Sequence, residues 1–212
     1  MEGDLPKLNL DNYSSPDEAI EKVEELLNEP FLEISKKFPF DRFESNHQVL
    51  FRFFLSRFFG VHGGIARELK HSNPHSVFPL LRVYFETLVS LIYSIKNPAY
   101  IDALVEFDPN PKNPILIAEE LFRRLEDESK TLRLIYHDLS RVTHPKADAV
   151  FSVFPPLREL DDGRKIMSWS LHPFWRDDND FMGSCAAIVE MAETAIIYLE
   201  EFGQRHLIGQ PN

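Results

Sequence analysis

The feature that most restricts the fold is the segment from Pro79 to Lys96, which would be apolar on nearly every side as a helix. Apart from Thr87 and the terminal lysine, its polar residues recur every four positions and would form one narrow stripe: Arg82, Glu86, Ser90 and Ser94. A helix with so little polar surface is expected at the centre of a protein, surrounded by other elements. Arg82 and Glu86 are one turn apart, so they can pair with each other.

The remainder of the chain is typical of a mainly α-helical bundle. A length of 212 residues suits one large domain, and 18 phenylalanines can fill its core. Capping and breaking signals predict five to six helices, with Pro30 ending the first and residues 31–43 forming a short helix and a loop. The others are expected over about 46–70, from soon after 74 to 96, over 100–107, over 115–143 in one piece or two, and from 177–180 to 202. We predict a single domain over residues 15–207, preceded by a flexible arm over residues 1–14.

One β-hairpin is expected within this bundle, near residues 149–171. Two β-like runs, Ala149–Phe154 and Lys165–Leu171, flank the turn signal Asp161-Asp162-Gly163. An isolated hairpin is only marginally stable in water. We therefore expect this one to lie against the helices.

Charge and cysteine content restrict the partners and the compartment. The net charge of -11 repels nucleic acid, so we expect no DNA binding, and RNA binding would need a local basic patch. The single Cys185 allows no internal disulfide and favours a reducing compartment. The N-terminus has no secretory signal pattern. The most apolar window, Val77–Ile95, contains Arg82 and Glu86, which a membrane span would accommodate only at high cost. We expect a cytoplasmic protein without membrane contact.

A second polar stripe is predicted close to the end of the 115–143 helical stretch. Tyr136, Ser140 and His144 follow one another at intervals of four residues along the border of an apolar face. Arg133, His137 and Arg141 form the adjoining line. If this stripe meets Arg82 and Glu86, the protein would contain an internal polar cluster. In one interpretation His144 acts as acid or base there while Arg82 or Arg141 binds an anion. In the other the cluster is structural: Arg82 pairs with Glu86, and His144 caps its helix.

The two stripes carry a resemblance to a known group of proteins. Arg82-x-x-x-Glu86, followed by Tyr136-x-x-x-Ser140-x-x-x-His144-Pro145, resembles an uncharacterised family of bacterial helical-bundle proteins near the HEPN (higher eukaryotes and prokaryotes nucleotide-binding) superfamily. The resemblance covers about residues 45–200. It implies a helical bundle, a homodimer, RNA or a nucleotide as ligand, and a role in phage defence or stress response.

The same resemblance defines two hypotheses about activity. Active HEPN ribonucleases use an arginine and a histidine four to six residues apart, without metal. Counting back from His144, those positions hold Leu139, Asp138 and His137. The first hypothesis is accordingly a binding or regulatory module. The alternative is a metal-independent ribonuclease in which His144 is the acid or base and Arg141 or Arg82 stabilises the phosphate.

No metal or cofactor is expected. Glu44-x-x-His47 and Glu68-x-x-His71 match the Glu-x-x-His motif of di-iron bundles. They flank one predicted helix, however, and the helical rise would place them roughly 35 Å apart. Gly63-Gly64 lacks the lysine and the preceding strand of a phosphate-binding loop.

Overall fold

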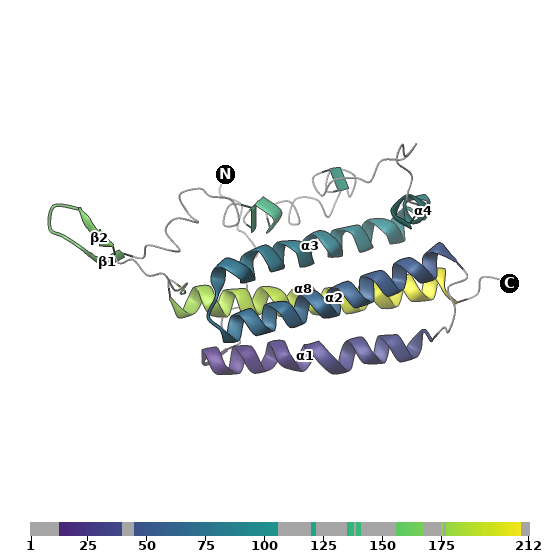
Figure 1. Ribbon diagram of the computed structural model, residues 1–212, viewed down its shortest axis with the longest axis horizontal. Helices are drawn as coiled ribbons and strands as arrows, with labels where there is room; N and C mark the ends of the chain where they lie inside the picture. Colours follow the sequence, from purple (N-terminus) through teal and green to yellow (C-terminus); the bar gives the residue numbers. More distant parts are fainter. Residues whose placement is uncertain are drawn as a thin grey trace.

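The main body of the protein is a bundle of long helices lying side by side (Figure 1). The computed structural model describes residues 13–39, 45–105, 120–121, 135–137, 139–140, 156–167, 175 and 177–208. The mainly α prediction is confirmed, while the number of helices depends also on residues outside this part. The long helices are α1 (Pro16–Lys37), α2 (Asn46–Lys70), α3 (Pro74–Lys96) and α8 (Asp178–His206), and a short helix, α4 (Ala99–Val105), lies against α2 and α3.

Side-chain caps explain where three of these helices begin. Ser15 accepts a hydrogen bond from the Glu18 backbone N–H at the start of α1. Ser45 and Gln48 exchange the two hydrogen bonds of a capping box at the start of α2. Asp177 accepts from the Asp180 N–H, 2.8 Å away, at the start of α8. Each cap satisfies backbone donors that have no partner within the helix, and this fixes the first residue.

The prediction that α1 ends at Pro30 is wrong. The helix continues through Pro30 to Lys37, although proline cannot donate the usual backbone hydrogen bond. Phe31 and Ile34, which follow the proline, are 2% and 4% exposed. Burying two such side chains stabilises the structure by roughly 1.5–3 kcal/mol each, which is comparable to the cost of about 3 kcal/mol for an interior proline.

The apolar segment forms α3, which is extensively buried and contacts α2, α4 and α8, whereas α2 rather than α3 contacts every other described helix. From Thr87 to Ile95 every residue except Ser90 is buried. The polar groups on this stretch are satisfied within their own helix. The Thr87 hydroxyl donates to the Val83 carbonyl and the Ser94 hydroxyl donates to the Ser90 carbonyl, each at 2.7 Å. These bonds remove the cost of burying unpaired hydroxyls.

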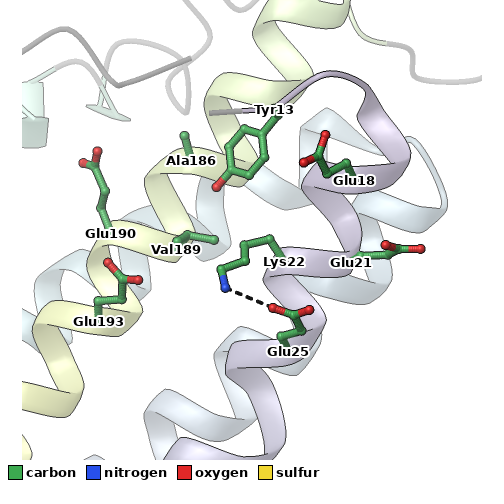
Figure 2. Close-up of a pocket in the computed structure, with 9 residues that line it drawn as sticks. All are labelled: Tyr13, Glu18, Glu21, Lys22, Glu25, Ala186, Val189, Glu190 and Glu193. Atoms are coloured by element: carbon green, nitrogen blue, oxygen red, sulfur yellow. Dashed lines mark hydrogen bonds and ion pairs between the residues drawn. The ribbon is translucent and has the colours of Figure 1, made fainter. Parts of the chain in front are cut away.

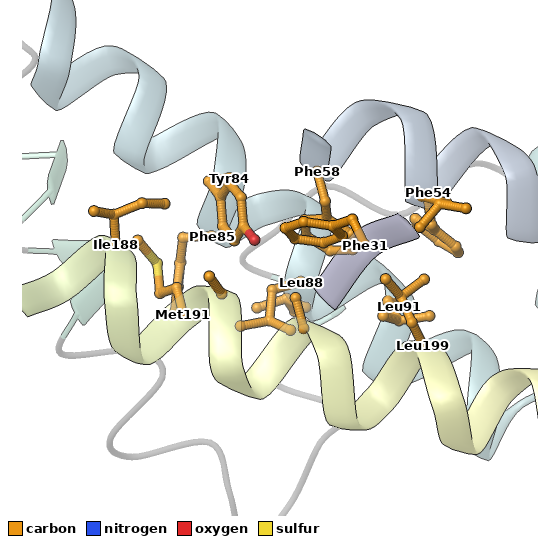
Figure 3. Packing of buried hydrophobic residues seen from close by; sticks show 14 of the residues in the cluster. Phe31, Phe54, Phe58, Tyr84, Phe85, Leu88, Leu91, Ile188, Met191 and Leu199 are labelled. Atoms are coloured by element: carbon orange, nitrogen blue, oxygen red, sulfur yellow. The ribbon is translucent and has the colours of Figure 1, made fainter. Parts of the chain in front are cut away.

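Aromatic side chains of α2 fill the space between the helices (Figure 3). Phe58 lies 4.9 Å, centroid to centroid, from Tyr84 of α3. Phe51 and Phe54 lie 6.2 and 6.3 Å from Phe202 of α8. Rings at these separations add about 0.5–1.5 kcal/mol per pair to the free energy gained by burial. The phenylalanines of α2 therefore join α2, α3 and α8 into one core.

The hairpin is present, but its position differs from the prediction. Strand β1 (Pro156–Glu159) pairs antiparallel with β2 (Lys165–Met167) around the expected turn, where Gly163 has a φ of 79° that favours glycine. The first predicted strand, Ala149–Phe154, lies outside the described residues. The expectation that the hairpin lies against the helices is not met by the helices that the structure describes: none of them contacts it, and it extends beyond the end of the bundle (Figure 1). A strong local turn signal fixes the hairpin, whereas nothing in that signal determines where it docks.

Three helices, α2, α3 and α8, are long and apolar enough to cross a membrane, judged by length and composition alone. Each also packs against the others in the bundle. A cytoplasmic location without membrane contact remains a prediction.

A tight contact between α8 and the residue that follows α1 gives a stability prediction. A Cβ atom on Gly203 of α8 would lie 2.5 Å from the ring of Phe38, the residue that ends α1. Gly203→Ala is therefore expected to lower the free energy of unfolding by about 1–3 kcal/mol because the ring must move. A Cβ on Gly60 of α2 would meet no atom within 4 Å. Gly60→Ala is accordingly expected to raise it by about 0.5–1 kcal/mol.

Urea unfolding of both variants tests this prediction. Both substitutions lower the backbone entropy of the unfolded chain in the same way, so their difference isolates the contact with Phe38. Equal stabilisation by the two alanines would show that Phe38 does not lie against α8.

Candidate functional site

One residue of each predicted polar stripe takes part in a contact at Arg82. Its Nε donates to Glu86 Oε1 at 2.9 Å, within α3. Its Nη2 donates to the Tyr136 hydroxyl, also at 2.9 Å. The guanidinium carbon lies 5.1 Å from the centroid of the Tyr136 ring, a cation–π distance. One arginine thus joins the central helix to a residue 54 positions further along the chain.

This cluster lies at the edge of the core. The side chains of Arg82 and Glu86 are 24% and 36% exposed. Burial alone lowers the pKa of Arg82, but the hydrogen bonds and charges of Glu86 and Tyr136 outweigh it, so the pKa is raised and the arginine stays charged. A partly exposed pair of this kind contributes at most about 1 kcal/mol to stability. The cluster therefore orients Tyr136 more than it stabilises the whole fold.

The structure describes only some of the other predicted site residues. Ser140 is helical and half-buried, one turn after Tyr136. His144 and Arg141, the predicted catalytic pair, lie outside the described residues. The structure thus brings together Arg82, Glu86 and Tyr136, and the ribonuclease hypothesis stays a prediction.

A groove between α1 and α8 was not predicted from the sequence. It has a volume of about 660 Å³, and Figure 2 shows glutamates on both sides with Tyr13 and Lys22 between them. Its floor includes the apolar residues Ala186 and Val189 of α8. The lining acids come from both helices: Glu18, Glu21 and Glu25 from α1, and Glu190 and Glu193 from α8.

Two of these five carboxylates have partners. Glu18 accepts hydrogen bonds from the backbone and hydroxyl of Ser14, and Glu25 pairs with Lys22 at 3.0 Å. Glu21, Glu190 and Glu193 form no ion pair with any residue that the structure describes. The groove therefore combines an open volume with uncompensated negative charge.

The protonation behaviour of the groove reflects that charge. Burial raises the pKa of Glu190, and the neighbouring Glu193 raises it further. Burial likewise raises the pKa of the Tyr13 hydroxyl, with further increases from Cys185, Glu193 and Glu190. Both groups resist a further negative charge, as expected in a negative potential. A positively charged ligand would reverse this effect.

A sequence signal for the groove exists but is incomplete. Glu18, Glu21 and Glu25 are three and four residues apart, and Glu190 and Glu193 are three apart, so each set lies on one face of its helix. Such sets are ordinarily solvated helix faces. Only the packing of α1 against α8 places them opposite each other.

Metal and thiol chemistry find little support among the described residues. His47 and His71 lie at opposite ends of α2, which is unbroken at Gly63-Gly64. No group of three His, Cys, Asp or Glu side chains in the described ranges is arranged to hold a metal ion. Cys185 is buried, and burial raises the pKa of its thiol to about 12. Such a thiol is a packing residue rather than a nucleophile.

Compared with protein-family models, with curated proteins and with solved structures, the chain matches none of them. The HEPN resemblance therefore rests on the residues of the two motifs alone. The contact between Arg82 and Tyr136 joins one residue of each motif.

The Arg82 cluster gives a prediction with a built-in control. Tyr136→Phe removes the hydroxyl that accepts from Arg82 but keeps the ring, and it is expected to lower the free energy of unfolding by about 0.5–1.5 kcal/mol. The Tyr84 hydroxyl is buried and makes no hydrogen bond to a described residue. Tyr84→Phe is therefore expected to keep or raise stability, because it removes an unpaired buried polar group.

Denaturant unfolding of the two tyrosine variants measures both effects. A Tyr136→Phe protein as stable as the wild type would contradict a stabilising hydrogen bond from Arg82.

Proposed function

We propose that this chain is a helical-bundle binding module whose ligand is an organic cation with several amino groups. The observation that carries this proposal is the groove between α1 and α8, which Glu21, Glu190 and Glu193 line without ion pairs among the described residues. A volume of about 660 Å³ lies within the range of about 300–1,000 Å³ typical of small-molecule sites.

The chemistry of the lining matches a linear polyamine. Such a ligand alternates ammonium groups with methylene segments, and the groove alternates carboxylates with the apolar surface of Ala186 and Val189. The Tyr13 ring offers a further contact for a cation. Because the opposing walls carry like charges, a bound cation would relieve their repulsion. The groove therefore selects for positive charge and for an extended shape.

Binding rather than chemistry is favoured by the state of Arg82. Its guanidinium is engaged by Glu86 and Tyr136, and the adjacent carboxylate disfavours a phosphate at the same place. These contacts support a structural role for the Arg82 cluster rather than anion binding. A HEPN-like family, a homodimer, RNA or a nucleotide as an alternative ligand, and a role in phage defence or stress response are separate proposals, which rest on the residues of the two sequence motifs alone.

Calorimetric titration with spermidine tests the binding site. We expect saturable binding at low ionic strength and a loss of affinity of about fivefold or more in Glu193→Gln, which removes one uncompensated carboxylate. Glu29→Gln is the matched control, because Glu29 is an exposed glutamate of α1 outside the groove. Equal losses in both variants would indicate attraction by net charge alone and would contradict a site.

The same titration should depend on pH in one direction. Cation binding requires the charged form of Glu190, whose pKa is raised in the free protein. Affinity is therefore expected to weaken as pH falls, beginning above the ordinary glutamate pKa of 4.5. In Glu190→Gln this early loss of affinity should be absent.

The ribonuclease hypothesis has a separate test. Labelled RNA is incubated with the protein in EDTA, beside His144→Ala. Cleavage by the wild type alone would establish metal-free catalysis at His144. The binding-module proposal predicts no cleavage by either protein. The unfolding midpoints of both proteins are measured as well, so that loss of folding is not mistaken for loss of activity.

A further inference from the structure

Two histidines meet where three helices come together at one end of the bundle. His47 is the second residue of α2 and His206 is the last residue of α8. Their rings are stacked, with centroids 5.1 Å apart and planes inclined by 28°. The His206 ring also lies 4.8 Å from Phe202 in the aromatic core. The pair therefore connects the start of α2 to the end of α8.

His206 is the more enclosed member and is held on one side only. It is 9% exposed, and its Nε2 has no hydrogen bond to any described residue. A hydrogen bond joins the ring to the carbonyl of Ile95, next to the last residue of α3. Because Nε2 has no such bond, the donor is Nδ1, and the neutral ring already satisfies that contact. A second proton would go on Nε2, where no described acceptor is available.

The charged groups around the pair offer little compensation for that proton. On α8, Arg205 is positive and pairs with Glu201. On α3, Lys96 follows Ile95, and on α4 the Asp102 carboxylate accepts a hydrogen bond from Asn46. Six residues before His206 on α8, Glu200 pairs with Lys37 of α1. His47 stands at the N-terminal end of α2, where the helix dipole disfavours a cation, whereas His206 stands at the C-terminal end of α8, where the dipole favours one.

We propose that the His47–His206 pair is a proton-sensitive latch, which holds the start of α2 against the end of α8 at neutral pH and releases it in acid. In the stacked arrangement two imidazolium rings would face each other within a few ångströms. Separation of the two helix ends would expose both rings to water and remove that repulsion.

The direction of the pH effect follows from the protonation of His206. Burial, then His47 and then Arg205 hold the pKa of His206 below its ordinary value of 6.5, against the opposing hydrogen bond to Ile95. The opened form therefore binds the proton more readily than the closed form. The contribution of the latch is full above about pH 6.5 and is lost as pH falls below that value.

Hydrogen exchange at pH 7.5 and 5.5 tests the latch in the full-length protein, with rates corrected for the intrinsic pH dependence. We expect amides of residues 47–50 and 203–206 to lose about five- to tenfold in protection at pH 5.5, because the opened form binds a proton at the ordinary histidine pKa of 6.5 and the closed form binds it less readily. In His47→Gln, which removes one of the two charges but leaves His206 buried, this local loss should be smaller than in the wild type. His71→Gln, at the opposite end of α2, should behave as the wild type.

Because the bundle contains a second buried histidine, the test must show where along the chain protection is lost. His62 is fully buried in the middle of the bundle, and burial lowers its pKa as well, so acid also weakens the contact of α2 with α1. If residues 60–64 lose as much protection as the latch residues, or if His47→Gln loses as much as the wild type, the proposal is wrong. His47→Phe keeps a stacked ring without a charge and replaces the glutamine variant if that protein fails to fold.

Discussion

The architecture depends on the burial of α3. A helix that is apolar around most of its circumference must be surrounded, and α2, α8 and α4 supply that surround. The hydroxyls of Thr87 and Ser94 do not interrupt this packing, because each donates to a carbonyl one turn back in the same helix. Polar groups that cannot be satisfied in this way, those of Arg82 and Glu86, lie at the edge of the core, where they reach each other and Tyr136.

Charge is distributed unevenly over the helices that form the bundle. No Asp or Glu occurs from residue 46 to residue 67, the larger part of α2, although the chain has 34 acidic residues. This allows α2 to present Phe51, Phe54 and Phe58 to the core without burying a carboxylate. The acids are concentrated instead on helices such as α1 and α8, and the contact between these two encloses part of that charge in the groove. The acidic groove and the aromatic core therefore both follow from the placement of acidic and aromatic residues on different helices.

Helix α8 takes part in each of the sites considered above except the Arg82 cluster. Glu190 and Glu193 line the groove near its middle, Gly203 accommodates the ring of Phe38, and His206 closes the end of the bundle. These residues lie on different faces of one long helix, and this lets α8 contact α1, α2 and α3 along its length. A change in the position of α8 would therefore alter the groove, the contact of Gly203 with Phe38 and the histidine pair together.

The sequence by itself determined the features that depend on residues close together in the chain. Ser15, Ser45 and Asp177 fix helix starts through hydrogen bonds to backbone three residues away, and Asp162-Gly163 fixes the hairpin turn. The periodicity of Arg82 and Glu86 also predicted the polar stripe correctly. Tertiary structure decided what depends on distant partners. It decided that α1 continues through Pro30, because Phe31 and Ile34 gain burial in the core, and that the hairpin stands apart from the described helices. It alone brought the acids of α1 opposite those of α8 and His47 onto His206, since periodicity gives the face of a helix but not the helix that covers it.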